Sequence, residues 1–201
     1  MHTLKRIWQR HRHGDGPFSH LFELPTDSDE LVAIDCETTG LDVRRAELVS
    51  VAAVPISHGR VRAGAALNLH VQAPASLDAT SIRIHRLRPV DLREGGDVRR
   101  VLEELLAFID NRPLVGWCLS FDMAILNRYT KALFGFELPN RRIELSSLYQ
   151  KRLRHRQPEQ VADLRFEQVA ADLGVPVMGR HSARGDATTA ALMYTRLVEK
   201  G

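Results

Sequence analysis

The stretch Leu31-Val-Ala-Ile-Asp-Cys-Glu-Thr-Thr-Gly-Leu41 decides the fold predicted for this chain. A short apolar run closed by a glycine-containing turn is typical of a buried strand. Side chains two residues apart on a strand point to the same side, so Asp35 and Glu37 share a face and Cys36 takes the other. Two neighbouring carboxylates repel each other and are costly to bury unless a cation lies between them. The pair indicates either a magnesium or manganese site or an ordinary strand that ends in a solvated loop.

Length and composition indicate a single globular domain with a sizeable core. The chain has 201 residues, of which 44% are hydrophobic and 26% are charged, as in ordinary globular proteins. The sequence contains no apolar run as long as a membrane span and no signal-peptide core at its N-terminus, so we expect a cytoplasmic protein. Cys36 and Cys118 both lie in apolar runs, which predicts buried, reduced thiols.

Residues 1–29 are interpreted as a basic N-terminal arm, and residues 30–201 as the functional domain. The arm carries no recognisable chemistry, and its histidines lack the spacing of a metal site. Its apolar side chains could pack a short helix onto the domain; they are Leu4, Ile7, Trp8, Leu21 and Phe22.

The middle of the chain predicts an antiparallel meander followed by a helix. After the opening strand, a second strand is expected over residues 47–56 and a third over 61–71, joined by a turn at His58-Gly59. An arginine-rich linker containing Ser81-Ile-Arg-Ile-His85 follows. Asp97 is expected to cap the next helix, whose apolar positions have a helical period.

The second half alternates short strands with helices. A strand is predicted over 113–118, a helix from about Phe121 and an edge strand over 143–145. A helix capped by Asp163 and a last helix from about Gly185 complete the chain. This order of elements predicts an α/β fold whose sheet has mixed strand directions.

Four acidic residues lie at strand or helix ends and on the core side of their elements. Asp122 and Asp186 each begin an inward apolar stripe, a position where a carboxylate also satisfies free helix amides. Together with Asp35 and Glu37 they suit a two-metal phosphoryl-transfer site, with cations roughly 3.5–4 Å apart. His181, in the loop before the last helix, could accept a proton from the attacking water, since histidine titrates near neutral pH.

Three motifs resemble the signature motifs of the DEDDh 3′–5′ exonucleases. They are Asp35-x-Glu37-Thr-Thr-Gly, Phe121-Asp122 and His181-x-Ala183-x-x-Asp186-Ala. The family includes the proofreading epsilon subunit of bacterial DNA polymerase III, ribonuclease T and oligoribonuclease, and the similarity runs from about Glu30 to the C-terminus. It implies a ribonuclease H-like fold, a mixed five-stranded sheet flanked by helices. It also implies two Mg²⁺ or Mn²⁺ ions on the four carboxylates, His181 as general base, and release of nucleoside monophosphates from a 3′ end.

The resemblance also suggests substrate contacts. In relatives, the positions of Thr38, Thr39 and Leu41 place backbone amides and an apolar wedge at the terminal nucleotide, and His85 lies in a segment that borders the substrate groove. The second motif departs from the family pattern, because Trp117-Cys118 replaces the usual His-Asn. Trp117 could instead stack on a base. This departure leaves the substrate preference open.

Several functional alternatives remain. The expected partner is a single-stranded DNA or RNA 3′ end. The motifs do not separate a DNA exonuclease acting in proofreading or repair from an exoribonuclease that trims short RNAs. A non-catalytic nucleic-acid-binding or polymerase-accessory module is the third reading. Because the chain stops at Gly201 directly after its last helix, we expect a stand-alone or differently partnered enzyme rather than a replicase subunit. The basic run Lys151–Arg156 is interpreted as either a phosphate-binding or a solvated surface.

Overall fold

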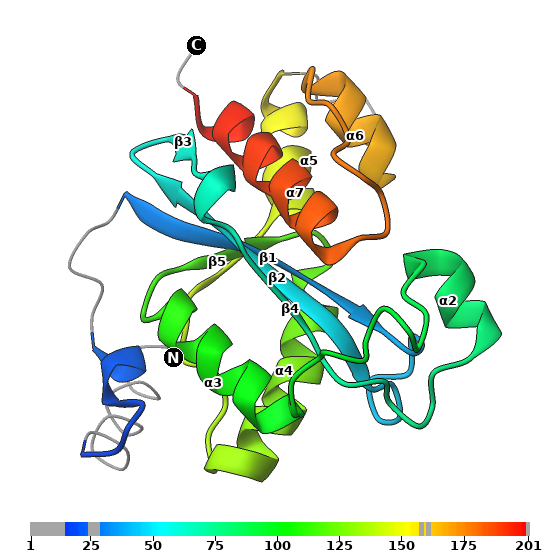
Figure 1. Cartoon of the computed structure of the whole chain (residues 1–201). Helices are drawn as coiled ribbons and strands as arrows, with labels where there is room; N and C mark the ends of the chain where they lie inside the picture. The colour runs from blue at the N-terminus through cyan, green and yellow to red at the C-terminus, as the bar shows by residue number, and fades with distance from the viewer. Residues whose placement is uncertain (1–14, 24–28, 157–158, 160–161, 200–201) are drawn as a thin grey trace.

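The computed structural model describes residues 15–23, 29–156, 159 and 162–199. Within them a twisted sheet lies between two layers of helices (Figure 1). The helices α3 and α4 lie on one side of the sheet, and α5, α6 and α7 lie on the other. None of the helices in these ranges is both long and apolar enough to cross a membrane.

The opening stretch forms a buried strand, as predicted, and this strand is the central one of the sheet. Strand β1 (Glu30–Thr38) pairs antiparallel with β2 (Leu48–Ser57) and parallel with β5 (Leu114–Gly116). Strand β6 (Arg142–Glu144) extends the parallel part of the sheet. Both β1 and β2 are buried almost throughout, because helices cover both faces of the sheet. This explains their nearly continuous apolar sequences.

The third predicted strand, over residues 61–71, is interrupted, and that part of the prediction is wrong. The chain forms β3 (Arg60–Val61), a 3₁₀ turn η2 (Ala63–Ala65) and then β4 (Leu67–His70), and both strands pair with β2. Ala63-Gly-Ala65 offers no β-branched or aromatic side chain to pack on a pleated surface. The sheet order is β3-β2-β1-β5-β6 with β4 beside β2, so the mixed five-stranded arrangement is confirmed, with its outer position split in two.

The first helical layer contains α3 (Val98–Ile109) and α4 (Leu119–Phe134). The expected cap of α3 is confirmed, since the side chain of Asp97 accepts a hydrogen bond from the Arg99 N–H at 2.8 Å. The 3₁₀ helix η1 (Ser19–Phe22) packs Leu21 and Phe22 into the same core. The other apolar residues of the predicted arm, Leu4, Ile7 and Trp8, lie outside the described residues. The boundary between residues 29 and 30 stays a prediction.

The second layer contains α5 (Leu145–Arg156), α6 (Phe166–Asp172) and α7 (Ala183–Val198). The predicted inward face of α7 is confirmed, because Asp186, Ala190, Met193 and Leu197 are all buried. The predicted cap of α6 is wrong. The residue at the cap position is Arg165, while Asp163 lies two residues earlier and pairs with the Arg165 guanidinium.

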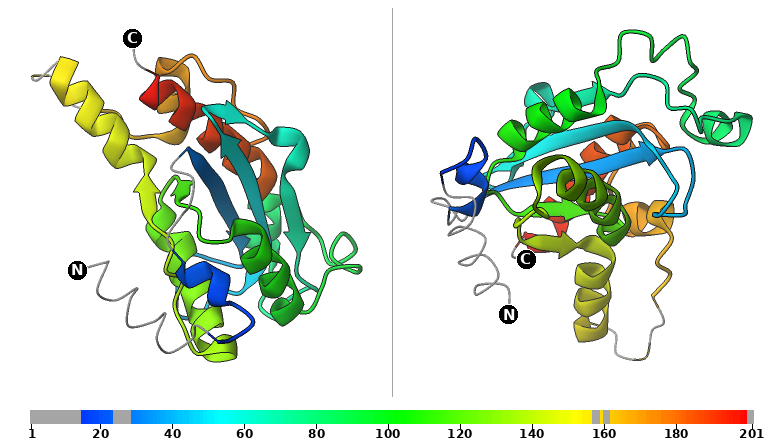
Figure 2. Two further views of the ribbon diagram at one scale, coloured as in Figure 1. Left: turned by 90° about the vertical axis from the view of Figure 1, so that its left-hand side faces the viewer. Right: turned by 90° about the horizontal axis from the view of Figure 1, so that it is seen from below.

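The segment interpreted as a linker contains a helix, α2 (Ala79–His85), which projects from the body of the domain (Figure 2). Its start is fixed by a capping box in which Asp78 and Ser81 bond each other's backbone N–H groups. The β-branched residues of the segment have low helix propensity and concealed the helix. The Asp-x-x-Ser spacing was the signal that could have revealed it.

Candidate active site

Three of the predicted carboxylates meet at the C-terminal half of β1. One carboxylate oxygen each from Asp35, Glu37 and Asp186 lies within 4.8 Å of the other two. The alternation of β1 puts the first two on one side of the strand. Asp186 comes from the first turn of α7, which packs across β1 and β2. The sheet therefore brings the first and third motifs together.

The fourth carboxylate, Asp122, is attached to the same strand by a hydrogen bond. Its Oδ1 atom accepts the main-chain N–H of Cys36 at 2.9 Å, between the two acidic residues of β1. Asp122 is buried in the first turn of α4. It lies outside the group of three mutually close carboxylates, but its charge still raises the pKa of Asp35.

Crowding and burial make full ionisation of this cluster unfavourable. Burial, followed by repulsion from Asp122, Glu37 and Asp186, raises the pKa of Asp35 well above its usual value. Burial and the charge of Asp186 raise the pKa of Glu37 to about 7. Burial raises the pKa of Asp122 to about 8, although the Cys36 N–H opposes the shift. Burial also raises the pKa of Asp186. Such a site requires protons or bound cations.

Arg180 supplies a positive charge that sequence reasoning missed. Its Nη1 atom lies 2.5 Å from Asp186 Oδ2 and its Nε atom 2.7 Å from Glu167 Oε1. The guanidinium also lies 4.5 Å from the centre of the Phe166 ring. The charge of Arg180 lowers the pKa of Asp35, Glu37 and Asp186, against the larger raising effect of burial. The sequence signal that could have identified Arg180 was its position directly before His181, the first residue of the third motif.

The residues present fit a divalent metal. Asp186 Oδ2 accepts hydrogen bonds from Arg180 Nη1 and from the His181 N–H, whereas its Oδ1 is buried with no partner among the described residues. A buried carboxylate oxygen without a partner is expensive unless a cation binds it. Converging carboxylate oxygens are the ligands that Mg²⁺ and Mn²⁺ prefer. Asp35, Glu37 and Asp186 therefore form a candidate metal site.

His181 lies on a fixed turn with its side chain exposed to solvent. Its backbone has a positive φ of 61°, and its N–H donates to Asp186 Oδ2 at 3.1 Å. Ser182 then caps α7 by accepting the Gly185 N–H at 3.1 Å. The turn thus holds the histidine beside the third-motif carboxylate while leaving the ring accessible. Its role as general base stays a prediction.

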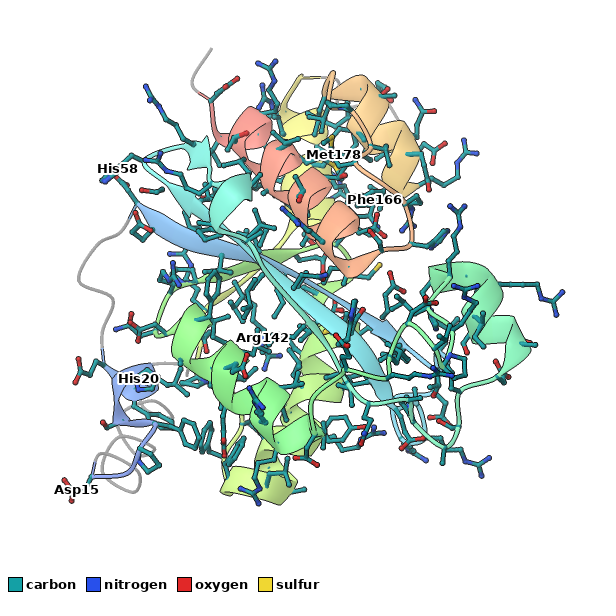
Figure 3. All side chains as sticks on the ribbon, viewed as in Figure 1. Asp15, His20, His58, Arg142, Phe166 and Met178 are labelled. Carbon is teal, nitrogen blue, oxygen red and sulfur yellow. The ribbon has the colours of Figure 1, made fainter. Side chains whose placement is uncertain are left out.

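Gly185 allows this turn to pass close to the start of α7. A Cβ atom at this position would lie 2.2 Å from Gly179 O and 2.4 Å from Met178 O, a separation that no side chain tolerates. Thr189, one turn further along α7, accepts the Met178 N–H at 2.9 Å. Figure 3 shows Phe166 and Met178 in the helical layer that contains α7. The glycine in the third motif is therefore required by the path of the preceding loop.

The departure in the second motif has a structural consequence. Cys118 occupies the cap position of α4 with a positive φ of 54° and makes no side-chain cap. Glu144 takes over that role, accepting the N–H of Cys118 at 3.0 Å and of Leu119 at 2.7 Å. Both cysteines are free, and Cys36 is buried as predicted, but Cys118 is exposed, so its predicted burial is wrong. Trp117 is half-buried and meets Phe166 edge-on at 5.5 Å.

The predicted substrate contacts lie in different environments. Leu41 is 88% exposed, as an apolar wedge requires. The side chain of Thr39 accepts the Glu47 N–H at 3.0 Å, and that of Thr38 donates to Gly40 O at 2.8 Å. His85 is only 4% exposed, and its Nδ1 accepts the Leu87 N–H at 3.0 Å. The substrate roles of these residues, and of Trp117, stay predictions.

The chain belongs to the exonuclease family, whose sequence model matches residues 32–194. This match spans the three acidic motifs and the sheet that carries them. Family membership and the convergence of these motifs on one strand agree with the predicted class, the DEDDh-type exonucleases.

Known relatives include parts of replicative DNA polymerases. The DNA polymerase III epsilon subunit of Aquifex aeolicus is 25% identical over 169 residues, covering 84% of this chain and 80% of that subunit. The PolC-type DNA polymerase III of Thermotoga petrophila is 26% identical over 168 residues, which is 84% of this chain but only 12% of the polymerase. Exonuclease I of E. coli, solved with single-stranded DNA, has a TM-score of 0.68 at 17% identity, covering 84% of this chain and 40% of its own. This similarity confirms the ribonuclease H-like fold.

Proposed function

We propose that this chain is a metal-dependent 3′–5′ exonuclease that hydrolyses single-stranded DNA or RNA from its 3′ end. The proposal rests on the close approach of carboxylate oxygens from Asp35, Glu37 and Asp186, which lie within 4.8 Å of one another. Asp122 accepts a hydrogen bond from the N–H of the strand residue between Asp35 and Glu37. Asp35 is half-buried and the other three carboxylates are buried. Such a cluster has no purely structural use, because the repulsion between its members opposes folding.

The chemistry divides between the cluster and the adjacent turn. Asp35, Glu37, Asp122 and Asp186 would hold two ions, Mg²⁺ or Mn²⁺, which when bound stabilise the charge that develops on the attacking and leaving oxygens. His181, exposed next to Asp186, accepts the proton from the attacking water. The water oxygen bonds to the phosphorus as the bond between phosphorus and the 3′ oxygen of the preceding nucleotide breaks. That 3′ oxygen takes up a proton from solvent. The products are a nucleoside 5′-monophosphate and a shortened strand with a free 3′ hydroxyl.

Single-stranded DNA is the first substrate to test. The similarity to exonuclease I, solved in complex with single-stranded DNA, and to a DNA polymerase III epsilon subunit supports this choice. We infer a role in proofreading or repair, with or without a polymerase partner. The second candidate is an exoribonuclease that trims short RNAs, which would use the same four carboxylates.

The test is degradation of matched 5′-labelled DNA and RNA oligonucleotides, in Mg²⁺, in Mn²⁺ and with a chelator. We expect a ladder that shortens from the 3′ end, is abolished by the chelator and is absent from Asp35→Ala. Glu104→Gln is the matched control, because Glu104 is an exposed carboxylate on α3, in the opposite helical layer. Binding of both polymers without cleavage would support the non-catalytic alternative and overturn the proposal.

A further inference from the structure

Arg180 lies next to the carboxylate cluster but has no role in the proposed reaction. Its positive charge lowers the pKa of the Asp35, Glu37 and Asp186 carboxylates. Its direct partner among them is Asp186, at 2.5 Å. A guanidinium is always charged and cannot neutralise itself by losing a proton. It therefore balances part of the negative charge of the cluster in the absence of any ion.

Two other contacts hold Arg180 independently of Asp186. Glu167, on α6, pairs with its Nε atom at 2.7 Å, and the ring of Phe166 lies beneath the guanidinium at 4.5 Å. Trp117 supports this ring by an edge-on contact. The side chain is 34% exposed, so it has room to move toward solvent. Arg180 can give up Asp186 and still keep an anion and an aromatic partner.

The other arginine near the start of α7 has no such placement. Arg184 is exposed, and its guanidinium donates to the carbonyl oxygen of Ala63 at 3.4 Å. Within the described part of the chain, Arg180 is the arginine that is ion-paired to a member of the carboxylate cluster. Arg180 and Arg184 are therefore a matched pair of arginines, of which Arg180 contacts the carboxylate cluster and Arg184 does not.

We propose that Arg180 is a resident counter-cation of the carboxylate cluster, which holds Asp186 before divalent ions bind and competes with them for its charge. This inference rests on the proposed metal-dependent function. A divalent ion at the cluster would lie close to the guanidinium, and like charges repel strongly in a partly buried site. Ion binding therefore weakens the Arg180–Asp186 contact, and that contact equally weakens ion binding, since coupling between two ligands is reciprocal.

The direct test is calorimetric titration of Mn²⁺ into substrate-free protein for the wild type, Arg180→Gln and Arg184→Gln. Both variants remove one positive charge, so any difference between them reports the position of the charge. We expect Arg180→Gln to bind Mn²⁺ more tightly, on the order of 5-fold or more, and Arg184→Gln to remain close to the wild type. Without metal, Arg180→Gln should also have a lower Tm, and Mn²⁺ should raise that Tm by more than it raises the wild-type value.

Two further variants keep the test decisive. Arg180→Lys retains the charge but lacks the planar fork, so its Mn²⁺ affinity should lie between those of the wild type and Arg180→Gln. Glu167→Gln removes the anion that competes with Asp186 for Arg180. The Arg180–Asp186 ion pair should then be stronger, and Mn²⁺ binding weaker. If Arg180 only fixed the loop, Arg180→Gln would bind Mn²⁺ as tightly as the wild type or more weakly, and either result overturns the inference.

The failure of the inference can be told from the failure of the proposed function. Absence of Mn²⁺ binding in the wild type would overturn both. Nuclease activity of the wild type, together with an unchanged Mn²⁺ affinity in Arg180→Gln, would overturn the inference alone.

Discussion

The Oδ1 atom of Asp122 accepts a hydrogen bond from the main-chain N–H of Cys36 at 2.9 Å. This bond joins α4 to the central strand at the residue between Asp35 and Glu37. It satisfies a buried backbone donor and fixes the orientation of the Asp122 carboxylate. The bond also opposes the effect of burial on the pKa of Asp122. One residue of the second motif thus has both a structural and an expected catalytic role.

Removing any of three carboxylates should abolish turnover while the protein remains folded. We expect this of Asp35→Ala, Asp122→Asn and Asp186→Ala, because each removes a charge needed to hold the ions. Asp122→Asn retains an acceptor for the Cys36 N–H, whereas Asp122→Ala leaves that donor unsatisfied, so Asp122→Ala should be less stable by about 1–3 kcal/mol. Nuclease assays and urea unfolding measure the two effects. Near-normal rates in Mg²⁺ for any of the three variants would contradict the two-metal assignment.

The crowded carboxylates predict that the metal-free protein loses stability as the pH rises. Glu37 has a pKa of about 7 and Asp122 of about 8 in the folded protein, against about 4 for both residue types in an unfolded chain. Between these values the folded state binds more protons than the unfolded state, so the free energy of unfolding falls from about pH 4 to about pH 8. The stabilisation is complete below about pH 4 and lost above about pH 8.

Urea unfolding in a chelator at pH 5, 6, 7 and 8 measures this slope. Because other groups titrate in the same range, the comparison is with Glu37→Gln and Asp122→Asn, each of which should have a shallower slope than the wild type. Mn²⁺ should also reduce the slope, since it stabilises the ionised carboxylates. Equal slopes for the wild type and both variants would show that these carboxylates titrate normally.

His181→Ala should lower the maximal rate by roughly 10²–10⁴-fold, the usual contribution of a general base. Substrate binding and metal affinity should change little, since the contact of residue 181 with Asp186 is made by the backbone N–H. His181→Asn is the control, since asparagine tolerates the positive φ of 61° without supplying a base. A wild-type maximal rate in either variant would assign the base role elsewhere.

The residues of the basic run on α5 have two different environments, so they give two separate predictions. Arg152 donates to the carbonyl oxygens of Arg196 and Leu197 at 2.6 and 2.8 Å, which closes the C-terminal end of α7. Arg152→Gln should therefore destabilise the protein by roughly 1–3 kcal/mol. Lys151 and Arg154 are exposed and available for substrate phosphates. If both bind single-stranded substrate, Lys151→Gln/Arg154→Gln should flatten the salt dependence of affinity by about 1.4 in log–log slope without altering the saturated rate. An unchanged slope would identify a solvated surface.

The sequence by itself determined the features that depend on local backbone geometry. The two-residue period of a strand put Asp35 and Glu37 on one side of β1, and the helical period of residues 98–109 predicted α3. Motif spacing selected the four carboxylates and His181 as candidate site residues. Local patterns were less reliable where propensity was weak, as in α2, or where small residues interrupted a strand, as in η2.

Only the tertiary structure decided how these parts meet. The bond from Cys36 to Asp122 joins residues 86 positions apart, and the cap that Glu144 provides for α4 reaches back 25 or 26 positions. Arg180 gains its significance only because α6, α7 and the intervening turn place Glu167, Phe166 and Asp186 around one guanidinium. Such contacts depend on the packing of whole elements across the sheet. No local period or propensity encodes them, because each partner satisfies its own local rules without reference to the other.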